Sequence, residues 1–139
     1  MLSSTCKSWV QSAQQDFIVI DSLMEQVRNP RLRPHEQVLY HSQQAAEKML
    51  KAYLVHKGIT PWGHILIELR RDCATFDVSF NQKRIIDHCA FLTIFNTVRY
   101  PDFVAYDIDA TLAARGLNSA KRIYDFVSIK LDLGKKFFI

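Results

Sequence analysis

Apolar and polar positions alternate along most of the chain with the period of an amphipathic helix. The pattern is clearest over residues 43–54, where spacings of three and four gather one wide apolar stripe: Ala45, Ala46, Met49, Leu50, Tyr53 and Leu54. The opposite edge of this helix is polar and carries His41, Gln44, Lys48 and Lys51. Glu47 and Lys51 lie four residues apart with the acid first, which is the favourable order for a helical ion pair. We therefore expect a central helix that packs on one side and presents a functional polar edge on the other.

The same periodicity predicts helices before and after this central one. A first helix over residues 3–28 ends at Asn29-Pro30, because the residue before a proline is pushed out of the helical region. The central helix spans residues 34–57, and Gly58 is its expected C-terminal cap. A short third helix follows at residues 64–74, and its inward-facing residues are predicted to be Ile65, Leu66, Leu69 and Cys73.

A fourth helix is predicted to begin at a capping box formed by Ser79 and Gln82. From Ile85 to Val98 this helix is apolar on almost every side, and Pro101 stops it. A helix with so little polar surface is buried on several sides, either by its own domain or by a second subunit.

A fifth helix is predicted to begin with Asp107 as its N-cap and to end at Gly134. Gly116 lies inside it, at a cost of about 1 kcal/mol relative to alanine. No repeat or domain boundary interrupts the pattern. The sequence therefore predicts an all-α fold, an up-and-down antiparallel bundle of about five helices, as a single domain over residues 1–139.

Composition agrees with one helical domain. Hydrophobic residues make up 48% and charged residues 23% of the 139 positions, and glycine and proline number only four each, which argues against a turn-rich β fold. The net charge of +4 permits an anionic partner without requiring one. Cys6, Cys73 and Cys89 form no CxxC pair, which favours a reduced, cytoplasmic protein. No signal-type start and no apolar run of the roughly 18 residues that a membrane helix needs is present, so no membrane association is expected.

The sequence predicts neither a metal ion nor another cofactor. No glutamate has a histidine three residues later, as a di-iron bundle would require, and no phosphate-binding glycine loop occurs. Asp107 and Asp109 allow a magnesium interpretation, but two acids at a helix start are favoured as caps and dipole partners. Cys73 and Cys89 lie on apolar faces and are expected to be small core residues.

Four motifs in order along the chain resemble the HEPN-domain family. The family's opening-helix pattern is matched by Trp9-Val10 with Ala13, Asp16 and Phe17. Its strongest helix signature is matched by Gln44-Ala45-Ala46-Glu47-Lys48, continuing through Leu50-Lys51-Ala52 to Leu54 and Gly58. Two further segments are similar to family motifs: Gly63-His64-x-Leu66-x-x-Leu69, with Gly63 in place of the usual Thr, and Arg99-Tyr100-Pro101-Asp102.

This resemblance implies a helical bundle that forms homodimers and acts in nucleotide chemistry. Many family members are ribonucleases, often toxins, and others are partners of small nucleotidyltransferases or nucleotide-binding modules. Nuclease members carry an Arg, four to six residues and then a His near the start of the last helix. In the dimer, the Arg and His of both subunits meet in one cleft.

The chain departs from that nuclease pattern. Counted from Arg99, the histidine would fall at Val104, Ala105 or Tyr106. RNA cleavage needs a side chain that titrates near neutrality, and a tyrosine, with an ordinary pKa of about 10, is a poor base. The RYPD form therefore favours binding over cleavage, and no catalytic residue is predicted.

The predicted ligand-binding residues are Lys48, Lys51, His64, Arg99, Tyr100 and Asp102. For each, a structural interpretation stays open beside the functional one. Arg99 either clamps a phosphate or satisfies helix carbonyls and pairs with Asp102, and Tyr100 either stacks on a base or packs. His64 either contacts a ligand or fixes its loop by hydrogen bonding. The two lysines either line a phosphate-binding groove or lie on a solvated face.

Three functional hypotheses follow. The first is a non-catalytic, dimeric HEPN protein that binds a nucleotide or nucleic acid, or partners a small nucleotidyltransferase in a toxin–antitoxin-like pair. The second is a ribonuclease that uses a non-standard residue, His64 or His88, supplied across the dimer. The third is a structural dimer whose RYPD loop only braces the bundle. The apolar fourth helix and the tail Phe137-Phe138-Ile139 both favour the dimer.

Overall fold

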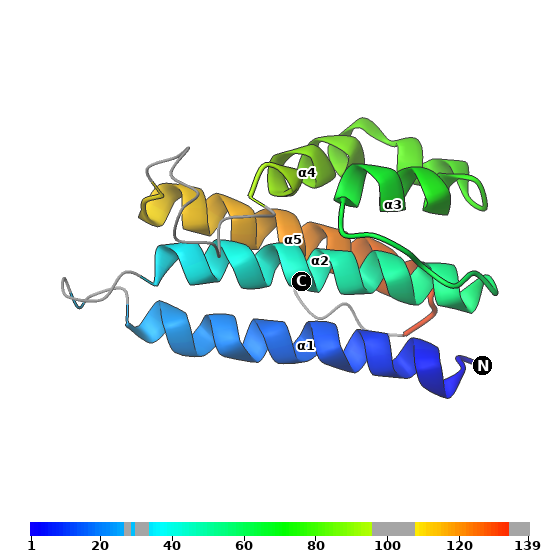
Figure 1. Cartoon of the computed structure of the whole chain (residues 1–139), viewed down its shortest axis with the longest axis horizontal. Coiled ribbons are helices and arrows are strands. Elements are labelled where there is room, and N and C mark those ends of the chain that lie inside the picture. Colours follow the sequence, from blue (N-terminus) through cyan, green and yellow to red (C-terminus); the bar gives the residue numbers. More distant parts are fainter. Residues whose placement is uncertain (27–28, 30–33, 96–107, 134–139) are drawn as a thin grey trace.

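The computed structural model describes residues 1–26, 29, 34–95 and 108–133, and every regular element within these ranges is helical. The elements are α1 (Ser4–Glu25), α2 (His35–His56), α3 (Leu66–Ala74), the short 3-10 helix η1 (Val78–Asn81), α4 (Lys83–Thr93) and α5 (Ala110–Lys130). The long helices α1, α2 and α5 form the body of the bundle, and α3 and α4 cover one side of it (Figure 1). The predicted all-α bundle of about five helices is confirmed.

Helix α2 is the centre of this bundle. It packs against α1 on one side and α5 on the other, and α3 lies along it (Figure 1). Helix α1 is antiparallel to α2, whereas α5 runs in the same direction as α2, because the chain doubles back after α2 and again along α4 (Figure 1). The predicted apolar stripe is buried without exception, with 0–2% exposure: Ala45, Ala46, Met49, Leu50, Tyr53 and Leu54.

The boundaries of α1 and α2 follow the predicted signals closely. Ser3 caps α1, and its hydroxyl oxygen accepts a hydrogen bond from the Cys6 amide at 3.1 Å. Helix α2 ends at His56, and Gly58 follows with a φ of 82°. That left-handed conformation suits glycine, which pays no Cβ penalty there, so Gly58 terminates the helix as expected.

The junction before α4 differs from the prediction. Ser79 and Gln82 form no capping box: residues 78–81 make η1, and α4 begins only at Lys83. The reason is Asp77, whose carboxylate accepts hydrogen bonds from the Ser79 amide at 2.9 Å and the Ser79 hydroxyl at 2.6 Å. An acid two residues upstream thus caps a separate turn in place of the predicted box.

Helix α3 and helix α4 also expose residues that were expected to be buried. Helix α3 begins at Leu66, two residues later than predicted, and Ile65 before it is 40% exposed rather than facing the core. On α4 one face is buried and carries Ile85, Cys89 and Leu92. Ile86 on another side of α4 and Ile94 directly after its end are exposed, so within this single chain α4 is amphipathic. The predicted end of this helix, Val98 to Pro101, lies outside the described residues.

Helix α5 is capped by Asp109, two residues after the predicted cap. The Asp109 carboxylate accepts from the Leu112 amide at 2.9 Å, while Asp107 and Gly134 lie outside the described residues. Gly116 is buried in α5 and faces the Leu39 side chain of α2, with Leu92 of α4 nearby. A glycine is used at this position because a side chain would overlap Leu39.

The cysteines are core residues. Cys6, Cys73 and Cys89 are free and fully buried, at 0% exposure. Burial raises the pKa of the Cys6 and Cys73 thiols and raises the pKa of Cys89 to about 12. Such thiols stay protonated and unreactive, in agreement with the predicted packing role of Cys73 and Cys89. Among the helices that the structure describes, none is long and apolar enough to cross a membrane.

Candidate functional site

The predicted polar edge of α2 faces α1, where Asp16 binds two of its residues. One oxygen of the Asp16 carboxylate lies 2.8 Å from Nδ1 of His41, and the other lies 2.7 Å from Nζ of Lys48. His41 and Lys48 are two helical turns apart, so a single carboxylate from α1 spans that length of α2. Asp16 itself is buried. Lys48 is therefore an ion-pair partner of α1 and not a free surface cation.

Glu47 forms a second buried centre on α2. Its Oε2 lies 3.0 Å from Nζ of Lys51 and 3.0 Å from Nδ1 of His64, and its Oε1 accepts a hydrogen bond from Gln43 at 3.2 Å. The Gln43 amide also donates to the His64 carbonyl oxygen at 3.3 Å, and Gln44 donates to the Gln43 oxygen at 2.7 Å. These contacts fix the loop before α3 onto α2. The predicted loop-holding role of His64 is thus present, although its side chain remains 70% exposed.

Lys51 differs most from its predicted surroundings. Its side chain is only 7% exposed, so the solvated-face interpretation is wrong. The ammonium group pairs with Glu47 and also lies over the indole ring of Trp9 on α1, 5.4 Å from the ring centroid. The predicted ion pair between Glu47 and Lys51 is confirmed. A buried lysine is retained here because a carboxylate and an aromatic face both stabilise its charge.

The charges along this α1–α2 interface balance. Asp16 and Glu47 contribute two negative charges, and Lys48 and Lys51 contribute two positive ones. The charges of these four groups sum to zero. An anion-binding site needs an excess of positive charge, so the two lysines by themselves make a weak phosphate clamp. They act mainly to join α1 to α2.

The structure brings together three of the six predicted ligand-binding residues. Lys48 and Lys51 lie along the α1–α2 interface, and His64 is joined to it through Glu47. Arg99, Tyr100 and Asp102 lie outside the described residues, so their placement beside His64 stays a prediction.

Sequence reasoning named Asp16 only as a motif residue and Glu47 only as a motif residue and partner of Lys51, and it missed that both are buried acids that organise this interface. Asp16 lies three residues after Ala13 and four before Ile20, both of them core positions of α1. Glu47 lies four residues after Gln43 and three before Leu50, both of them buried positions of α2. An acid at a core register is the signal that identifies such a residue, because an unpaired buried charge is too costly to keep.

His88 serves a separate, structural contact. Its Nδ1 lies 2.9 Å from the Ser119 hydroxyl of α5, so it joins α4 to α5. Burial lowers the pKa of His88, and the positive charges of Arg122 and Arg84 act in the same direction against the opposing effect of Asp87. Among the residues that the structure describes, no group of three His, Cys, Asp or Glu side chains is arranged to hold a metal ion.

One comparison with known proteins gives a match. The model of a family described as the HEPN domain matches residues 6–130, which covers the described helices except for the first two residues of α1. No curated protein and no solved structure matches the chain.

Proposed function

The chain belongs to the HEPN family, and on that premise we propose that it is a non-catalytic binding module for a nucleotide or nucleic acid. The observation that carries the proposal is the Arg99-Tyr100-Pro101-Asp102 segment, which keeps the arginine of the nuclease pattern and has no histidine at the required spacing. Without a histidine at that spacing, this segment lacks the base and acid that RNA cleavage needs. The arginine can still bind a phosphate bidentately.

Within this site, we assign the anion-binding role to Arg99 rather than to the lysines. Lys48 and Lys51 are each within 3.0 Å of a buried carboxylate, so their charges are already compensated. In this proposal Tyr100 stacks on a base and Asp102 is a further ligand-binding residue. His64, exposed and held by Glu47, contributes from the loop before α3.

Binding measurements with the Arg99→Ala variant test this assignment. We expect it to weaken the affinity for ATP, GTP or a short RNA at least about tenfold, because it removes a charge-assisted contact to phosphate. Arg122→Ala is the matched control, since Arg122 is an exposed arginine on α5. An Arg99→Ala affinity equal to that of the wild type excludes Arg99 from the site.

We further propose that the module is a homodimer, works in the cytoplasm and pairs with a small nucleotidyltransferase in a toxin–antitoxin-like system. Ile86 on α4 and Ile94 directly after it are exposed and support a subunit contact, and the free buried cysteines suit a reducing compartment. Light scattering should give twice the chain mass of 16.1 kDa. Co-purification with the product of a neighbouring nucleotidyltransferase gene tests the pairing; a monomeric protein that captures no such enzyme contradicts both.

One geometric observation favours a second candidate function, a ribonuclease that uses His64. A buried carboxylate that holds Nδ1 of an exposed histidine is the arrangement of a general acid–base pair, in which Nε2 acts on the substrate. Incubation with transfer or messenger RNA decides between the two. Cleavage that is lost in His64→Ala and kept in His56→Ala, an exposed histidine at the end of α2, supports the ribonuclease. Absence of any cleavage by the wild type excludes it.

A further inference from the structure

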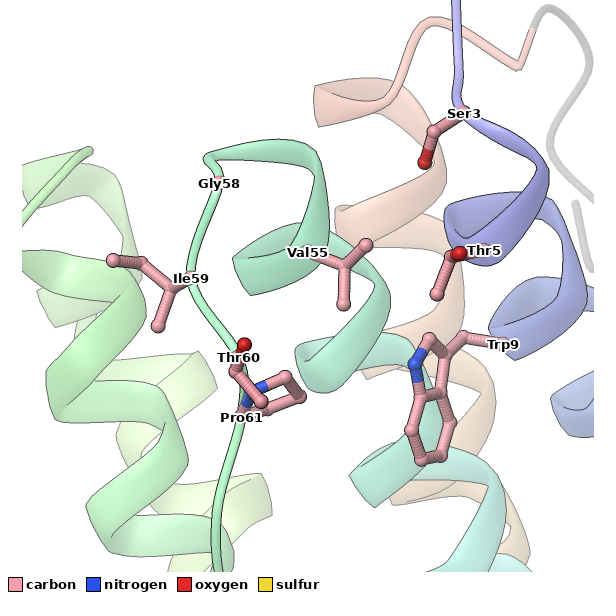
Figure 2. Close-up of a pocket in the computed structure, with 8 residues that line it drawn as sticks. All are labelled: Ser3, Thr5, Trp9, Val55, Gly58, Ile59, Thr60 and Pro61. Atoms are coloured by element: carbon pink, nitrogen blue, oxygen red, sulfur yellow. The ribbon is translucent and has the colours of Figure 1, made fainter.

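A pocket of about 430 Å³ opens at the end of the bundle where α1 begins and α2 ends. Its lining comes from two chain segments: Ser3, Thr5 and Trp9 at the start of α1, and Val55, Gly58, Ile59, Thr60 and Pro61 at the end of α2 and in the loop that follows. Figure 2 shows Trp9 facing Thr60 and Pro61 across the opening, with Val55 between them. The volume lies in the range of about 300–1,000 Å³ that is typical of ligand pockets, so a whole aromatic side chain fits.

The lining determines which chemical groups suit the pocket. None of the lining residues is charged, so a charged group inside it would have no counter-charge. One wall is the indole of Trp9, which also lies under the Lys51 ammonium, 5.4 Å from the ring centroid. Hydroxyl oxygens of three lining residues are available as hydrogen-bond acceptors: Ser3, Thr5 and Thr60. The pocket therefore suits an uncharged aromatic ring with a single donor at its edge, which is the chemistry of an indole.

The loop that forms one wall of the pocket also exposes such a ring. Trp62 directly follows the lining residue Pro61 and is 83% exposed. Ile59 and Ile65 in the same segment are 42% and 40% exposed. Three large apolar side chains within seven residues thus face water, although an aromatic side chain ordinarily buries about 150–250 Å².

This loop is anchored rather than free. Gly58 and Gly63 bracket it with φ values of 82° and 83°, a left-handed conformation that favours glycine. Directly after Gly63, the carbonyl oxygen of His64 accepts a hydrogen bond from Gln43 at 3.3 Å, and the His64 ring lies 3.0 Å from Glu47. A preorganised loop loses little conformational entropy when a partner covers it, which favours its use as a binding surface.

We propose that Trp62 of one protomer inserts into this pocket of a second copy of the chain, and that the second copy inserts its own Trp62 in return. A two-fold interface uses the same surface on both subunits, so that surface must carry a protruding group beside a recess. The adjacent residues Pro61 and Trp62 meet this requirement, since one lines the recess and the other protrudes. Residues 58–63 carry no charge that would repel the same loop of another copy.

The inference rests on the proposed homodimer and assigns its contact to this loop rather than to the exposed isoleucines at α4. Truncating the ring and filling the recess test it. Trp62→Ala removes the inserted ring, Val55→Phe occupies the recess, and Ile18→Ala removes a 63% exposed side chain of α1 nine residues from Trp9. Sedimentation equilibrium measures the dissociation constant of the dimer, after circular dichroism has established that each variant folds.

We expect Trp62→Ala to weaken the dimer at least about hundredfold, because each dimer loses two tryptophan anchors. Val55→Phe should weaken it at least about tenfold. Ile18→Ala should stay within about twofold of the wild type, because this position lies about 13 Å along the helix from Trp9. A dimer of Trp62→Ala as tight as that of the wild type overturns the proposal, and this variant decides even if Val55→Phe does not fold.

Mixing the two variants separates an exchange of side chains from a simple face-to-face contact. Trp62→Ala keeps the recess and Val55→Phe keeps the protruding ring, so a mixture can form one of the two contacts that each variant alone lacks. The mixed dimer should be at least about tenfold tighter than either variant with itself. Thr60→Phe, at an exposed lining position, replaces Val55→Phe if that variant does not fold. A mixture that associates no better than its components contradicts the exchange.

Tryptophan fluorescence gives an independent measurement, because the chain has only two tryptophans. In Trp9→Phe the wall stays aromatic and Trp62 is the one remaining reporter. Its emission should move to shorter wavelength as the protein concentration rises through the dissociation constant, since the ring passes from water into an apolar pocket. An emission maximum that stays unchanged while the mass doubles overturns the insertion.

These measurements also distinguish the loop contact from the proposed homodimer. A dimer that Ile86→Asp dissociates and Trp62→Ala leaves intact retains the homodimer and overturns the exchange. A wild type that stays monomeric at every concentration removes both. If N-acetyltryptophanamide binds that monomer in calorimetry, the pocket takes an aromatic group from another source, and the exchange between copies is again overturned.

Discussion

The exposed imidazole of His64 lies 3.0 Å from the buried carboxylate of Glu47. The same carboxylate oxygen lies 3.0 Å from the Lys51 ammonium, and the side chain of Glu47 is only 4% exposed. One buried acid thus joins the centre of α2 to the loop before α3 and compensates a buried lysine. The position of His64 depends on Glu47, whichever function His64 serves.

Glu47→Gln should therefore destabilise the fold by about 3 kcal/mol, because it leaves the Lys51 charge buried without its counter-charge. Glutamine keeps the size and part of the hydrogen bonding, so the loss reports mainly on charge. Urea unfolding of the wild type and the variant at neutral pH measures the difference in free energy.

Asp87→Asn is the matched control for that experiment. Asp87 pairs with Lys83 at the same four-residue spacing on α4, but the two side chains are 57% and 89% exposed. An exposed pair is screened by water and contributes little to stability, so this variant should unfold almost like the wild type. Equal losses in the two variants would show that burial of the Glu47 pair has no special energetic weight.

Gly116→Ala should destabilise the protein by about 1–2 kcal/mol, because the added methyl group overlaps the Leu39 side chain and overpacks the core. At an unconstrained helical position the same change stabilises a helix by about 1 kcal/mol. Thermal or urea unfolding distinguishes the two signs. In a Leu39→Ala background, where the space is vacant, Gly116→Ala should become stabilising. Stabilisation of the otherwise unchanged protein would refute close packing of α5 on α2.

The helices were predictable because their signals are local. Apolar residues at spacings of three and four predict the ends of α1, α2 and α5 to within a few residues, at the ends that the structure describes. The apolar stripe predicted for α2 is buried at every position. The errors lie at junctions where one side chain outcompetes another. Asp77 captures the Ser79 amide, and Asp109 rather than Asp107 caps α5.

The candidate site was less predictable because its environment comes from across the fold. Lys51 has the sequence pattern of a surface lysine, and only Trp9 on α1 and Glu47 beside it explain its burial. Asp16 and His41 meet across two helices and are 25 positions apart in the chain. Periodicity identifies a polar edge but does not say whether that edge meets water or an acid on a neighbouring helix.

Asp77→Ala should cost about 1 kcal/mol at neutral pH, because it removes the cap of η1 and the ion pair with Lys130 at 2.9 Å. Hydrogen bonds from Ser79 and Lys130 lower the pKa of Asp77 from 3.8 to about 2 in the folded protein. The carboxylate therefore stabilises the fold at pH values above the pKa that Asp77 has in the unfolded chain, and this contribution is lost as the pH falls toward 2. Urea unfolding at pH 6 and pH 2.5 measures the effect. A difference in unfolding free energy between the wild type and the variant that stays constant over this pH range contradicts the assignment.

His88 should make the fold less stable in mild acid. Burial is the largest cause of the shift and lowers the pKa of His88 below the ordinary value of 6.5, so the folded state favours the neutral ring. The unfolded chain therefore binds a proton at His88 more readily than the folded protein does. The neutral ring contributes its full stability at pH values above the pKa of the unfolded chain, and this contribution is lost as the pH falls through the pKa of the folded protein. His88→Gln should accordingly flatten the decline in unfolding free energy between about pH 7.5 and 5. Urea unfolding at several pH values measures both slopes.

Ser119→Ala is the control that separates burial from the hydrogen bond. It removes the hydroxyl 2.9 Å from His88 but leaves the ring between α4 and α5. Since burial is the main cause of the lowered pKa, this variant should lose stability at every pH and keep the wild-type slope. A slope that flattens in Ser119→Ala as much as in His88→Gln would instead assign the pH dependence to the hydrogen bond. Identical slopes in His88→Gln and the wild type would remove His88 from the acid response altogether.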